Sequence, residues 1–163
     1  RRVLFHLIEH CNGKYIIMGD ADDSYNFLEL SLFIERLQAG YDMVMGNRFA
    51  GGITKGAMPW LHRYVGNPFL SSLGRFLFKN NIGDFHCGLR AFTKKCYNII
   101  NPQCNGMEFA SELVALASIH QMRICEIPVT LYPDGRKRRP HLRSWRDGFR
   151  HMVLLYSLYL LRN

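Results

Sequence analysis

A short apolar segment that ends abruptly in carboxylates is the feature that most constrains the fold of this 163-residue sequence. The run Tyr-Ile-Ile-Met is followed at once by Gly19, Asp20, Ala21 and Asp22. An apolar run of this length beside a glycine predicts a buried strand of an α/β sheet, here over residues 14–19. Ligands of such sheets bind just beyond the carboxyl ends of the strands. Two carboxylates spaced this way can both reach one hard cation that also binds substrate phosphates.

The acidic loop admits other interpretations that the sequence leaves open. Asp23 or Ser24 could act simply as the N-cap of the helix that follows. An aspartyl-phosphate phosphatase would carry Thr or Val where Ser24 stands, so that match is poor. A calcium-binding EF-hand loop is set aside, because it would need Gly in place of Tyr25 and Glu in place of Ser31.

The composition is that of a folded chain with a basic surface. Hydrophobic residues make up 48% of the sequence, which excludes a disordered or fibrous protein. The formal net charge of +8 favours an anionic partner such as a nucleotide, a nucleic acid or a phospholipid surface. The five cysteines form no Cys-x-x-Cys pair, which argues against a disulfide framework or a zinc knuckle and favours a reducing compartment.

Predicted strands alternate with predicted helices along the chain, which indicates an α/β fold. The expected elements are a helix ending near residue 12, the strand over 14–19, a helix over 27–38, a strand over 42–45, a helical stretch from residue 59 that Pro68 should kink, a strand over 87–93, a helix over 107–118, an edge strand over 123–131 and a last helix over 145–161. Because the sequence opens on the end of a helix, we expect that an upstream segment is absent.

Polar residues follow the second predicted strand and the helix after it. Arg48 stands at a strand exit and could bind a phosphate through two hydrogen bonds, or could be a solvated surface residue. His62, Arg63 and Asn67 share one face of the next helix through their spacing. They could meet an anionic substrate or merely form a polar helix face.

A second group of candidates lies in the middle of the chain. Asp84 and His86 precede a predicted strand, whereas Cys87 lacks the sequence partners of a zinc ligand or a nucleophile. Glu108 and Glu112 lie four residues apart on one predicted helix, among apolar neighbours. Such glutamates are usually solvated, but one of them could face the site as a base or position a substrate hydroxyl.

A basic segment followed by an aromatic helix closes the sequence. Arginines and one lysine crowd residues 136–150, and Trp145, Phe149, Tyr156 and Leu160 fall on one helical side. This order is typical of a helix that lies on an anionic membrane surface. The alternative is a helix that packs into the core with a solvated basic edge. We expect no nucleic-acid partner, because the aromatic residues are not interleaved as stacking platforms.

Six segments together resemble the family-2 glycosyltransferases, most closely the branch that uses dolichol or polyprenol phosphate. They are Gly19-Asp20-Ala21-Asp22, Gly46-Asn47-Arg48-Phe49, Trp60 to Asn67, Asp84 to Phe92, Gly106 to Glu112 and Glu126-Ile127-Pro128-Val129. The resemblance implies a Rossmann-like nucleotide-diphospho-sugar transferase domain of GT-A type, incomplete at its N-terminus. It would occupy residues 1–143, with residues 144–163 as an amphipathic juxtamembrane helix.

The resemblance also implies roles for individual residues. Asp20 and Asp22 would hold Mg²⁺ or Mn²⁺ on the diphosphate of the donor, and Arg48 and Arg63 would bind the phosphate of the acceptor. The residues expected to be catalytic are Asp22, Asp84 and Glu112. The residues expected to contact substrate are Asp23, Asn47, Arg48, Arg63, Asn67, His86, Arg90, Arg136 and Arg139.

The reaction implied by the resemblance is transfer of a hexose, with inversion, from a nucleotide-diphospho-sugar to a polyprenyl phosphate at the cytoplasmic face of a membrane. An acceptor phosphate is ionised at neutral pH and needs no strong base. A sugar hydroxyl acceptor would need one, and Asp84 or Glu112 is the candidate. The rival expectation is a catalytically degenerate, basic module that binds the membrane surface.

Overall fold

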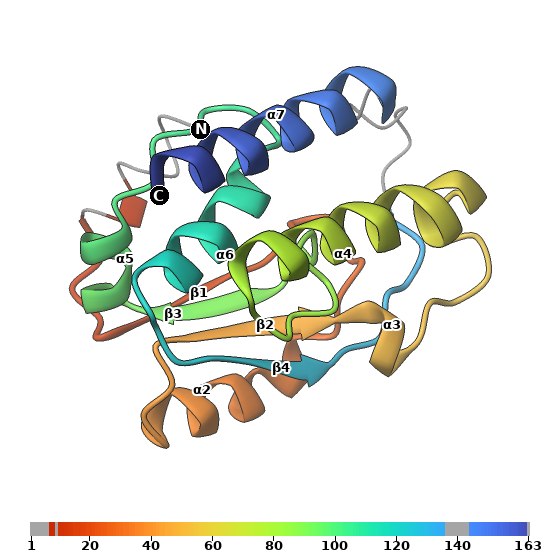
Figure 1. Ribbon diagram of the computed structural model, residues 1–163. Helices are drawn as coiled ribbons and strands as arrows, with labels where there is room; N and C mark the ends of the chain where they lie inside the picture. Colours follow the sequence, from red (N-terminus) through yellow and green to blue (C-terminus); the bar gives the residue numbers. More distant parts are fainter. Residues whose placement is uncertain (1–6, 9, 136–143, 163) are drawn as a thin grey trace.

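A four-stranded sheet of mixed direction lies at the centre of the computed structural model, which describes residues 7–8, 10–135 and 144–162 (Figure 1). The strands, in their order across the sheet, are β1 (Tyr15–Met18), β3 (Arg90–Thr93), β2 (Met43–Asn47) and β4 (Ile124–Pro128). Strand β3 runs antiparallel to both of its neighbours, and β2 runs parallel to β4. Strands β1, β2 and β4 therefore all point the same way.

The register of the strands brings the candidate segments to one edge of the sheet. Met18 at the end of β1 pairs with Arg90 at the start of β3, and Arg90 pairs in turn with Met45 of β2. Met45 is also aligned with Glu126 of β4. The loops that follow β1, β2 and β4 consequently meet the loop that precedes β3, which is where ligands of α/β sheets bind.

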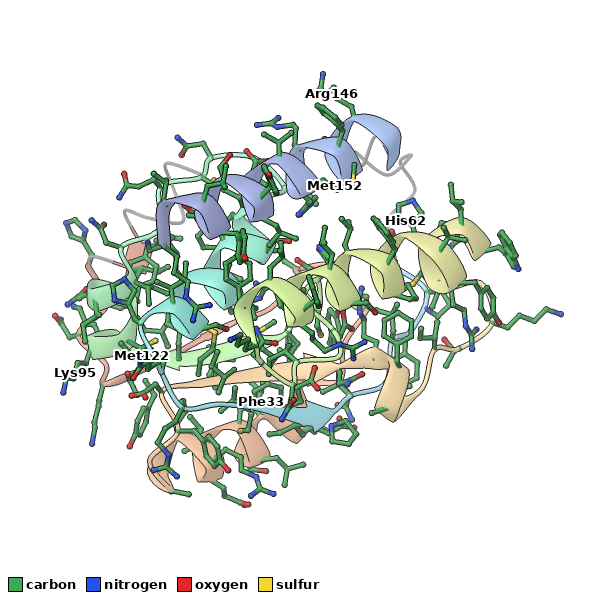
Figure 2. All side chains as sticks on the ribbon, viewed as in Figure 1. Phe33, His62, Lys95, Met122, Arg146 and Met152 are labelled. Carbon is green, nitrogen blue, oxygen red and sulfur yellow. The ribbon has the colours of Figure 1, made fainter. Side chains whose placement is uncertain are left out.

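Apolar residues on the two faces of the sheet form two separate cores. Met43 and Met45 contribute to one core, whereas Val44 between them contributes to the other, as the alternation of side chains along a strand requires. Helices α4 (Asn67–Phe78), α6 (Phe109–Ile119) and α7 (Ser144–Arg162) cover the first face, and α2 (Leu30–Gln38) covers the second (Figure 1). Phe33 of α2 is fully buried beneath the sheet (Figure 2).

The helices predicted over 27–38, 107–118 and 145–161 are confirmed with changes at their ends, whereas most of the helix predicted before residue 12 lies outside the described residues. The helix expected over 27–38 begins as a 3₁₀ turn, η1 (Phe27–Glu29), because the side chain of Asn26 accepts a hydrogen bond from the backbone of Leu28. It ends at Gly40, which adopts a left-handed φ of 90°. Two short helices were not expected from the sequence: α3 (Arg48–Gly51) and α5 (Lys94–Ile100).

The interruption expected near Pro68 takes the form of a widened helical turn. The segment η2 (His62–Gly66) is π-helical and runs directly into α4. Pro68 has no N–H to donate back along the helix, and the backbone N of Asn67 bonds to the carbonyl oxygen of His62, five residues earlier. Isolated π turns of this kind are common at functional sites.

The last helix packs against the core with one of its sides, as one of its two predicted alternatives requires, and its contact with a membrane stays a prediction. One side of α7 packs on α6 and α4 through buried residues that include Leu155 and His151. Its other side leaves Phe149, Val153 and Tyr156 exposed. The predicted domain boundary at residue 143 stays a prediction. Within the described part of the chain, no helix combines the length and the apolar character needed to span a membrane.

Candidate active site

The acidic loop after β1 is held in a defined shape by its own residues. Oδ1 of Asp22 accepts hydrogen bonds from the backbone N of Ser24, at 3.2 Å, and from its hydroxyl. Asp23 adopts a left-handed φ of 60°, which Asp tolerates better than most residues. Asp20 is exposed, and its carboxylate lies directly against Gly88 of the loop before β3. Local hydrogen bonding thus fixes the loop while Asp20 remains open to solvent.

The loop before β3 is tied to the acidic loop by Tyr25. The hydroxyl oxygen of Tyr25 accepts a hydrogen bond from the backbone N of Gly88 at 3.0 Å, and Sγ of Cys87 lies 3.7 Å from the same oxygen. Burial raises the pKa of Tyr25, so its hydroxyl stays protonated. Burial also raises the pKa of Cys87, to about 11, which removes this thiol from consideration as a nucleophile.

The segment that follows β4 closes on the same loop. The backbone N of Tyr132 donates to the carbonyl oxygen of Ser24, and that of Gly135 donates to the carbonyl oxygen of Asp22 at 2.9 Å. The predicted phosphate ligands Arg136 and Arg139 lie outside the described residues.

We expect Gly88→Ala to weaken metal binding without unfolding the protein. A Cβ atom at position 88 would lie 1.9 Å from Oδ2 of Asp20, so the exposed carboxylate must turn away from the loop. The free energy of unfolding should change by less than about 1 kcal/mol, because only the end of a surface side chain moves. Titration calorimetry with Mn²⁺ measures the first effect and urea unfolding the second.

Gly148→Ala in α7 is the matched control for this substitution. A Cβ atom at position 148 meets no atom within 4 Å, so this change should leave Mn²⁺ affinity intact. It should stabilise the helix by about 0.5–1 kcal/mol. Unchanged Mn²⁺ affinity in Gly88→Ala would contradict the contact between Gly88 and a metal-binding Asp20.

Arg48 and Asp84, for which the sequence predicts roles in the site, form a buried ion pair with each other. Nε of Arg48 lies 2.7 Å from Oδ2 of Asp84, Nη2 lies 2.8 Å from Oδ1, and the backbone N of Arg48 also donates to Oδ2. Asp84 is fully buried and Arg48 nearly so. Burial alone would raise the pKa of Asp84, but the charge and hydrogen bonds of Arg48 outweigh burial and lower it. Arg48 is therefore engaged by a carboxylate, and the same ion pair makes Asp84 a weaker base than an isolated carboxylate.

Asn47, a predicted contact with substrate, has a structural task in this fold. Its Oδ1 accepts from the backbone N of Ala50 and caps α3, while its Nδ2 donates to Glu126 at 3.1 Å. The other carboxylate oxygen of Glu126 accepts from the backbone N of Gly83 and of Asp84, each at 2.9 Å. The Asn47 amide thus caps α3 with its oxygen and ties β2 to Glu126 of β4 with its nitrogen, and Glu126 in turn holds the loop before β3.

The two glutamates at the start of α6 both have partners within the protein. The two carboxylate oxygens of Glu112 accept hydrogen bonds from the backbone N of Gln103 and of Cys104, so this side chain shapes the loop before α6. Glu108 forms an ion pair with Arg150 of α7 at 2.6 Å. The buried carboxylate of Glu112 is thus occupied by backbone donors, and its expected catalytic role stays a prediction.

Two further predicted contacts with substrate are turned inward. Arg90 is buried and donates to the backbone carbonyls of Cys87 and Ala110. Nε2 of His86 lies 3.0 Å from the hydroxyl of Ser111. These hydrogen bonds connect both side chains to the loop before β3 and to α6 from within the protein.

The helix that starts near Pro59 supplies the remaining polar candidates. Arg63 is partly exposed, with Nη1 3.4 Å from the carbonyl oxygen of Ile53 and its guanidinium 5.3 Å from the ring centre of Tyr64. Nδ2 of Asn67 contacts Sδ of Met58 at 3.5 Å. Burial lowers the pKa of His62, and the charge of Arg48 lowers it further. Figure 2 shows His62 on the helix that crosses above the sheet.

The acidic loop suits a hard divalent cation that is bound mainly by its substrate. Asp20 and Asp22 offer only carboxylate oxygens, which Mg²⁺ and Mn²⁺ prefer. No set of three or more His, Cys, Asp or Glu side chains in the described ranges is arranged to hold a metal ion by itself. One or two carboxylates completed by substrate phosphates is the arrangement that Mg²⁺ usually adopts.

Tyr25 and Glu126 are functional supports that the sequence did not identify. Tyr25 follows the acidic loop closely, but nothing in its spacing indicates a hydrogen bond to a residue 63 positions away. Glu126 belongs to one of the segments that carry the family resemblance, yet that resemblance gave it no role. Only the folded arrangement shows that both hold the loop before β3.

Comparisons with known proteins agree with this architecture. Residues 2–99 match the family model described as Glycosyl transferase family 2. The hexosyltransferase Agl6 of low-salt glycan biosynthesis in Haloferax volcanii is 38% identical over 90% of this chain and 35% of its own length. Polyprenol monophosphomannose synthase of Mycolicibacterium smegmatis is 30% identical over 71% of this chain and 44% of its own length. The chain thus spans between a third and a half of these relatives.

A solved structure shares the fold. Glucosyl-3-phosphoglycerate synthase of Mycobacterium tuberculosis, crystallised with Mn²⁺, uridine-diphosphate-glucose and phosphoglyceric acid, superposes with a TM-score of 0.68. The alignment covers 96% of this chain and 53% of that one, at 15% sequence identity. The likeness confirms the predicted α/β fold of GT-A type, with its mixed sheet.

Proposed function

This chain belongs to glycosyl transferase family 2, and on that premise we propose that it carries the diphosphate-binding and acceptor-binding side of an enzyme that transfers a hexose from a nucleotide-diphospho-sugar to a polyprenyl phosphate. The observation that carries the proposal is the acidic loop after β1. Asp20 and Asp22 stand at the edge of the sheet where the loops after β1 and β4 meet the loop before β3. That edge is where an α/β sheet binds its ligand.

The donor diphosphate is the ligand that this loop suits best. A divalent cation held by Asp20 and Asp22 would neutralise the charge that develops on the leaving diphosphate. Tyr25 contributes by holding Gly88 against Asp20, and Ser24 contributes by holding Asp22. A preorganised pair of carboxylates needs little rearrangement when the substrate arrives. The Mn²⁺ and sugar nucleotide named with the solved neighbour support this assignment by analogy.

A phosphate acceptor is favoured over a hydroxyl acceptor. A hydroxyl needs a general base, but Asp84 has a lowered pKa in its ion pair with Arg48, and Glu112 is occupied by backbone donors. A phosphate oxygen is already ionised at neutral pH and needs no base. The names of two relatives, a dolichyl-phosphate hexose transferase and a polyprenol monophosphomannose synthase, support the same choice.

Arg63→Ala is expected to weaken use of the acceptor and to spare the donor. Arg63 is the partly exposed arginine next to the loop after β2, and loss of one charge-assisted contact costs about 1.5–3 kcal/mol. The KM for polyprenyl phosphate should therefore rise roughly tenfold to a hundredfold in a radiolabelled transfer assay. Arg36→Ala, at an exposed arginine of α2 on the other face of the sheet, is the control and should leave KM unchanged. A fall in donor affinity would assign Arg63 to the other substrate.

We further propose that α7 and α4 lie against an anionic membrane surface on its cytoplasmic side. Exposed apolar residues recur along α7 at Phe149, Val153, Tyr156 and Leu160, the spacing of one helical side. The neighbouring helix α4 exposes Phe69 and Phe76. Apolar side chains beside arginines are typical of helices at the headgroup boundary. This arrangement would bring a lipid-linked acceptor beside the acidic loop.

The chain is expected to bind vesicles that contain phosphatidylserine and to lose that binding when the apolar side of α7 is removed. Phe149→Ser combined with Leu160→Ser should weaken co-sedimentation at least tenfold, since each buried side chain contributes about 1.5–3 kcal/mol. Leu28→Ser is the matched control, because Leu28 is 90% exposed and lies in η1, directly before α2 and not on α7 or α4. Equal binding to neutral vesicles would contradict the electrostatic contribution, which salt should weaken.

A degenerate membrane-binding module is the remaining alternative. It would bind such vesicles but would show no Mn²⁺-dependent affinity for a sugar nucleotide. Calorimetry with and without Mn²⁺ therefore separates the two functions.

A further inference from the structure

Three polar side chains connect α7 to the loop before β3. Nε2 of His86 lies 3.0 Å from Oγ of Ser111, and that oxygen lies 2.8 Å from Nδ1 of His151. Ser111 of α6 and His151 of α7 are buried. The two imidazole rings meet edge to face, with centres 4.8 Å apart. A single hydroxyl thus holds a loop and two helices together.

The hydrogen bonds that join His86, Ser111 and His151 run in one direction from donor to acceptor. A hydroxyl carries one proton, so Ser111 donates to one imidazole and accepts from the other. Burial and the neighbouring His151 lower the pKa of His86 to about 3, although Asp84 opposes them. His86 is therefore neutral at physiological pH, and its hydrogen bond to Ser111 is retained at that pH. Among the described residues none bonds to Nδ1 of His86, so Ser111 is the partner that orients this ring.

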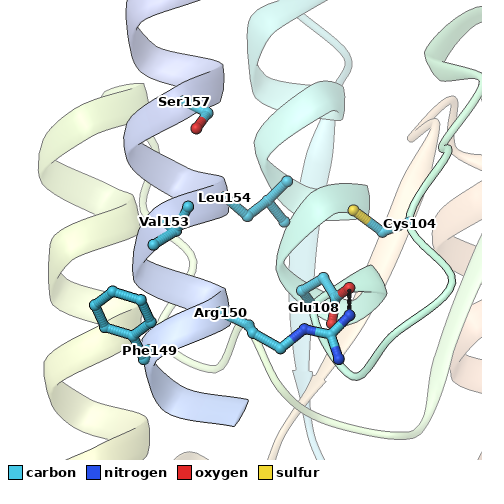
Figure 3. Close-up of a pocket in the computed structure, with 7 residues that line it drawn as sticks. All are labelled: Cys104, Glu108, Phe149, Arg150, Val153, Leu154 and Ser157. Carbon is cyan, nitrogen blue, oxygen red and sulfur yellow. Dashed lines mark hydrogen bonds and ion pairs between the residues drawn. The ribbon is translucent and has the colours of Figure 1, made fainter. Parts of the chain in front are cut away.

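The same turn of α7 makes a second polar contact with the start of α6. Arg150, next to His151, pairs with Glu108 at 2.6 Å beside a groove of about 360 Å³ (Figure 3). Apolar contacts such as those of Leu155 hold α7 in place but are not directional. The polar contacts of two consecutive residues therefore fix how α7 is rotated and placed on α6.

His86, at the other end of this series of hydrogen bonds, is connected to the acidic loop through Gly88. The backbone N of His86 donates to Oδ1 of Asp84 at 3.2 Å, and Gly88 follows two residues later. The Cα of Gly88 forms the surface against which Asp20 lies. A shift of His86 would consequently move that surface and change the position of Asp20.

We propose that Ser111 and His151 are positioning residues, which set the loop of residues 84–88, and through it Asp20, according to how α7 is placed on α6. The consequence for metal binding rests on the proposed function, whereas the coupling between α7 and the two loops does not. A partner or a membrane that moves α7 would thereby alter the order of the acidic loop.

Ser111→Ala and Ser118→Ala provide a matched comparison within α6. Ser118 lies two turns after Ser111, and its hydroxyl bonds to Val114 and Asn80 at the far end of the helix. Hydrogen–deuterium exchange of the whole chain is measured by mass spectrometry, together with Mn²⁺ affinity in the presence of UDP. Ser111→Ala should accelerate exchange roughly fivefold at residues 20–25 and 84–90 and weaken Mn²⁺ binding by a similar factor, because one buried hydrogen bond is lost. Ser118→Ala should stay within about twofold.

Two substitutions of His151 separate positioning from packing. His151→Asn keeps a polar atom near the place of Nδ1 and should retain slow exchange in the acidic loop. His151→Phe keeps a ring of similar size but cannot bond to Ser111, and should behave like Ser111→Ala. If exchange in the acidic loop is slower in His151→Phe than in His151→Asn, His151 acts through packing and the proposal fails.

Hydrogen–deuterium exchange tests the coupling between α7 and the acidic loop, whereas Mn²⁺ affinity in the presence of UDP tests the proposed function. Exchange in the acidic loop that does not respond to Ser111→Ala overturns the coupling. A wild-type chain that binds no Mn²⁺ with UDP overturns the proposed function, while the exchange measurement, which needs no ligand, still decides the coupling.

Discussion

Asp22→Asn is expected to remove most metal-dependent transfer and to leave the fold intact. Oδ1 of Asp22 accepts both hydrogen bonds from Ser24, and an asparagine side chain keeps an Oδ1 acceptor in that place. The substitution therefore removes the charge and preserves the loop. A metal ion contributes several kcal/mol to stabilising a leaving diphosphate, so the rate should fall on the order of 10²- to 10³-fold.

The measurement is transfer of labelled hexose to polyprenyl phosphate, with Mn²⁺ affinity determined separately by calorimetry. Glu35→Gln is the matched control, because Glu35 is an exposed carboxylate of α2 on the other side of the sheet. It should leave both quantities unchanged. A rate for Asp22→Asn within a few-fold of wild type, with ordinary Mn²⁺ dependence, would refute the assignment of the acidic loop.

Arg48→Ala is expected to destabilise the protein by about 3–5 kcal/mol, because it leaves the carboxylate of Asp84 buried and unpaired. Asp84→Ala should cost a similar amount. Most of the typical stability of a domain, 5–15 kcal/mol, could be lost in this way. Urea unfolding followed by circular dichroism measures the loss, and Arg63→Ala should change stability by less than about 1 kcal/mol.

The double substitution Arg48→Met with Asp84→Leu tests whether the unpaired charge causes this loss of stability. Replacing both charges with apolar side chains removes the unpaired charge and should recover most of the lost stability.

The dependence of stability on pH that this ion pair causes has a definite sign. Because the pKa of Asp84 is lowered in the folded protein, its contribution is present above the unfolded value of about 4 and is lost as pH falls through the folded value. A stable Arg48→Ala variant would restore Arg48 as a candidate ligand for phosphate.

The general fold followed from local patterns in the sequence, and the family followed from the resemblance of six of its segments to known glycosyltransferases. The apolar run before Gly19 predicted β1, and helical periodicity predicted α2, α6 and α7 within a few residues. Two helices were missed because their patterns are short: α3 covers four residues within a glycine-rich stretch, and α5 covers seven. Strand β3 proved shorter than predicted, since residues 87–89 form part of the loop against the acidic site. The position of β3 between β1 and β2 could not be derived from chain order.

The sequence by itself determined the chemical groups of this site, because Asp20 and Asp22 are neighbours in the chain and follow a strand that local pattern predicts. The tertiary structure alone decided which polar side chains remain available for substrate. Arg48 meets Asp84 across 36 residues, Asn47 meets Glu126 across 79, and Ser111 meets His151 across 40. Burial requires each polar group to find a partner, and that partner is set by how strands and helices pack rather than by spacing along the chain.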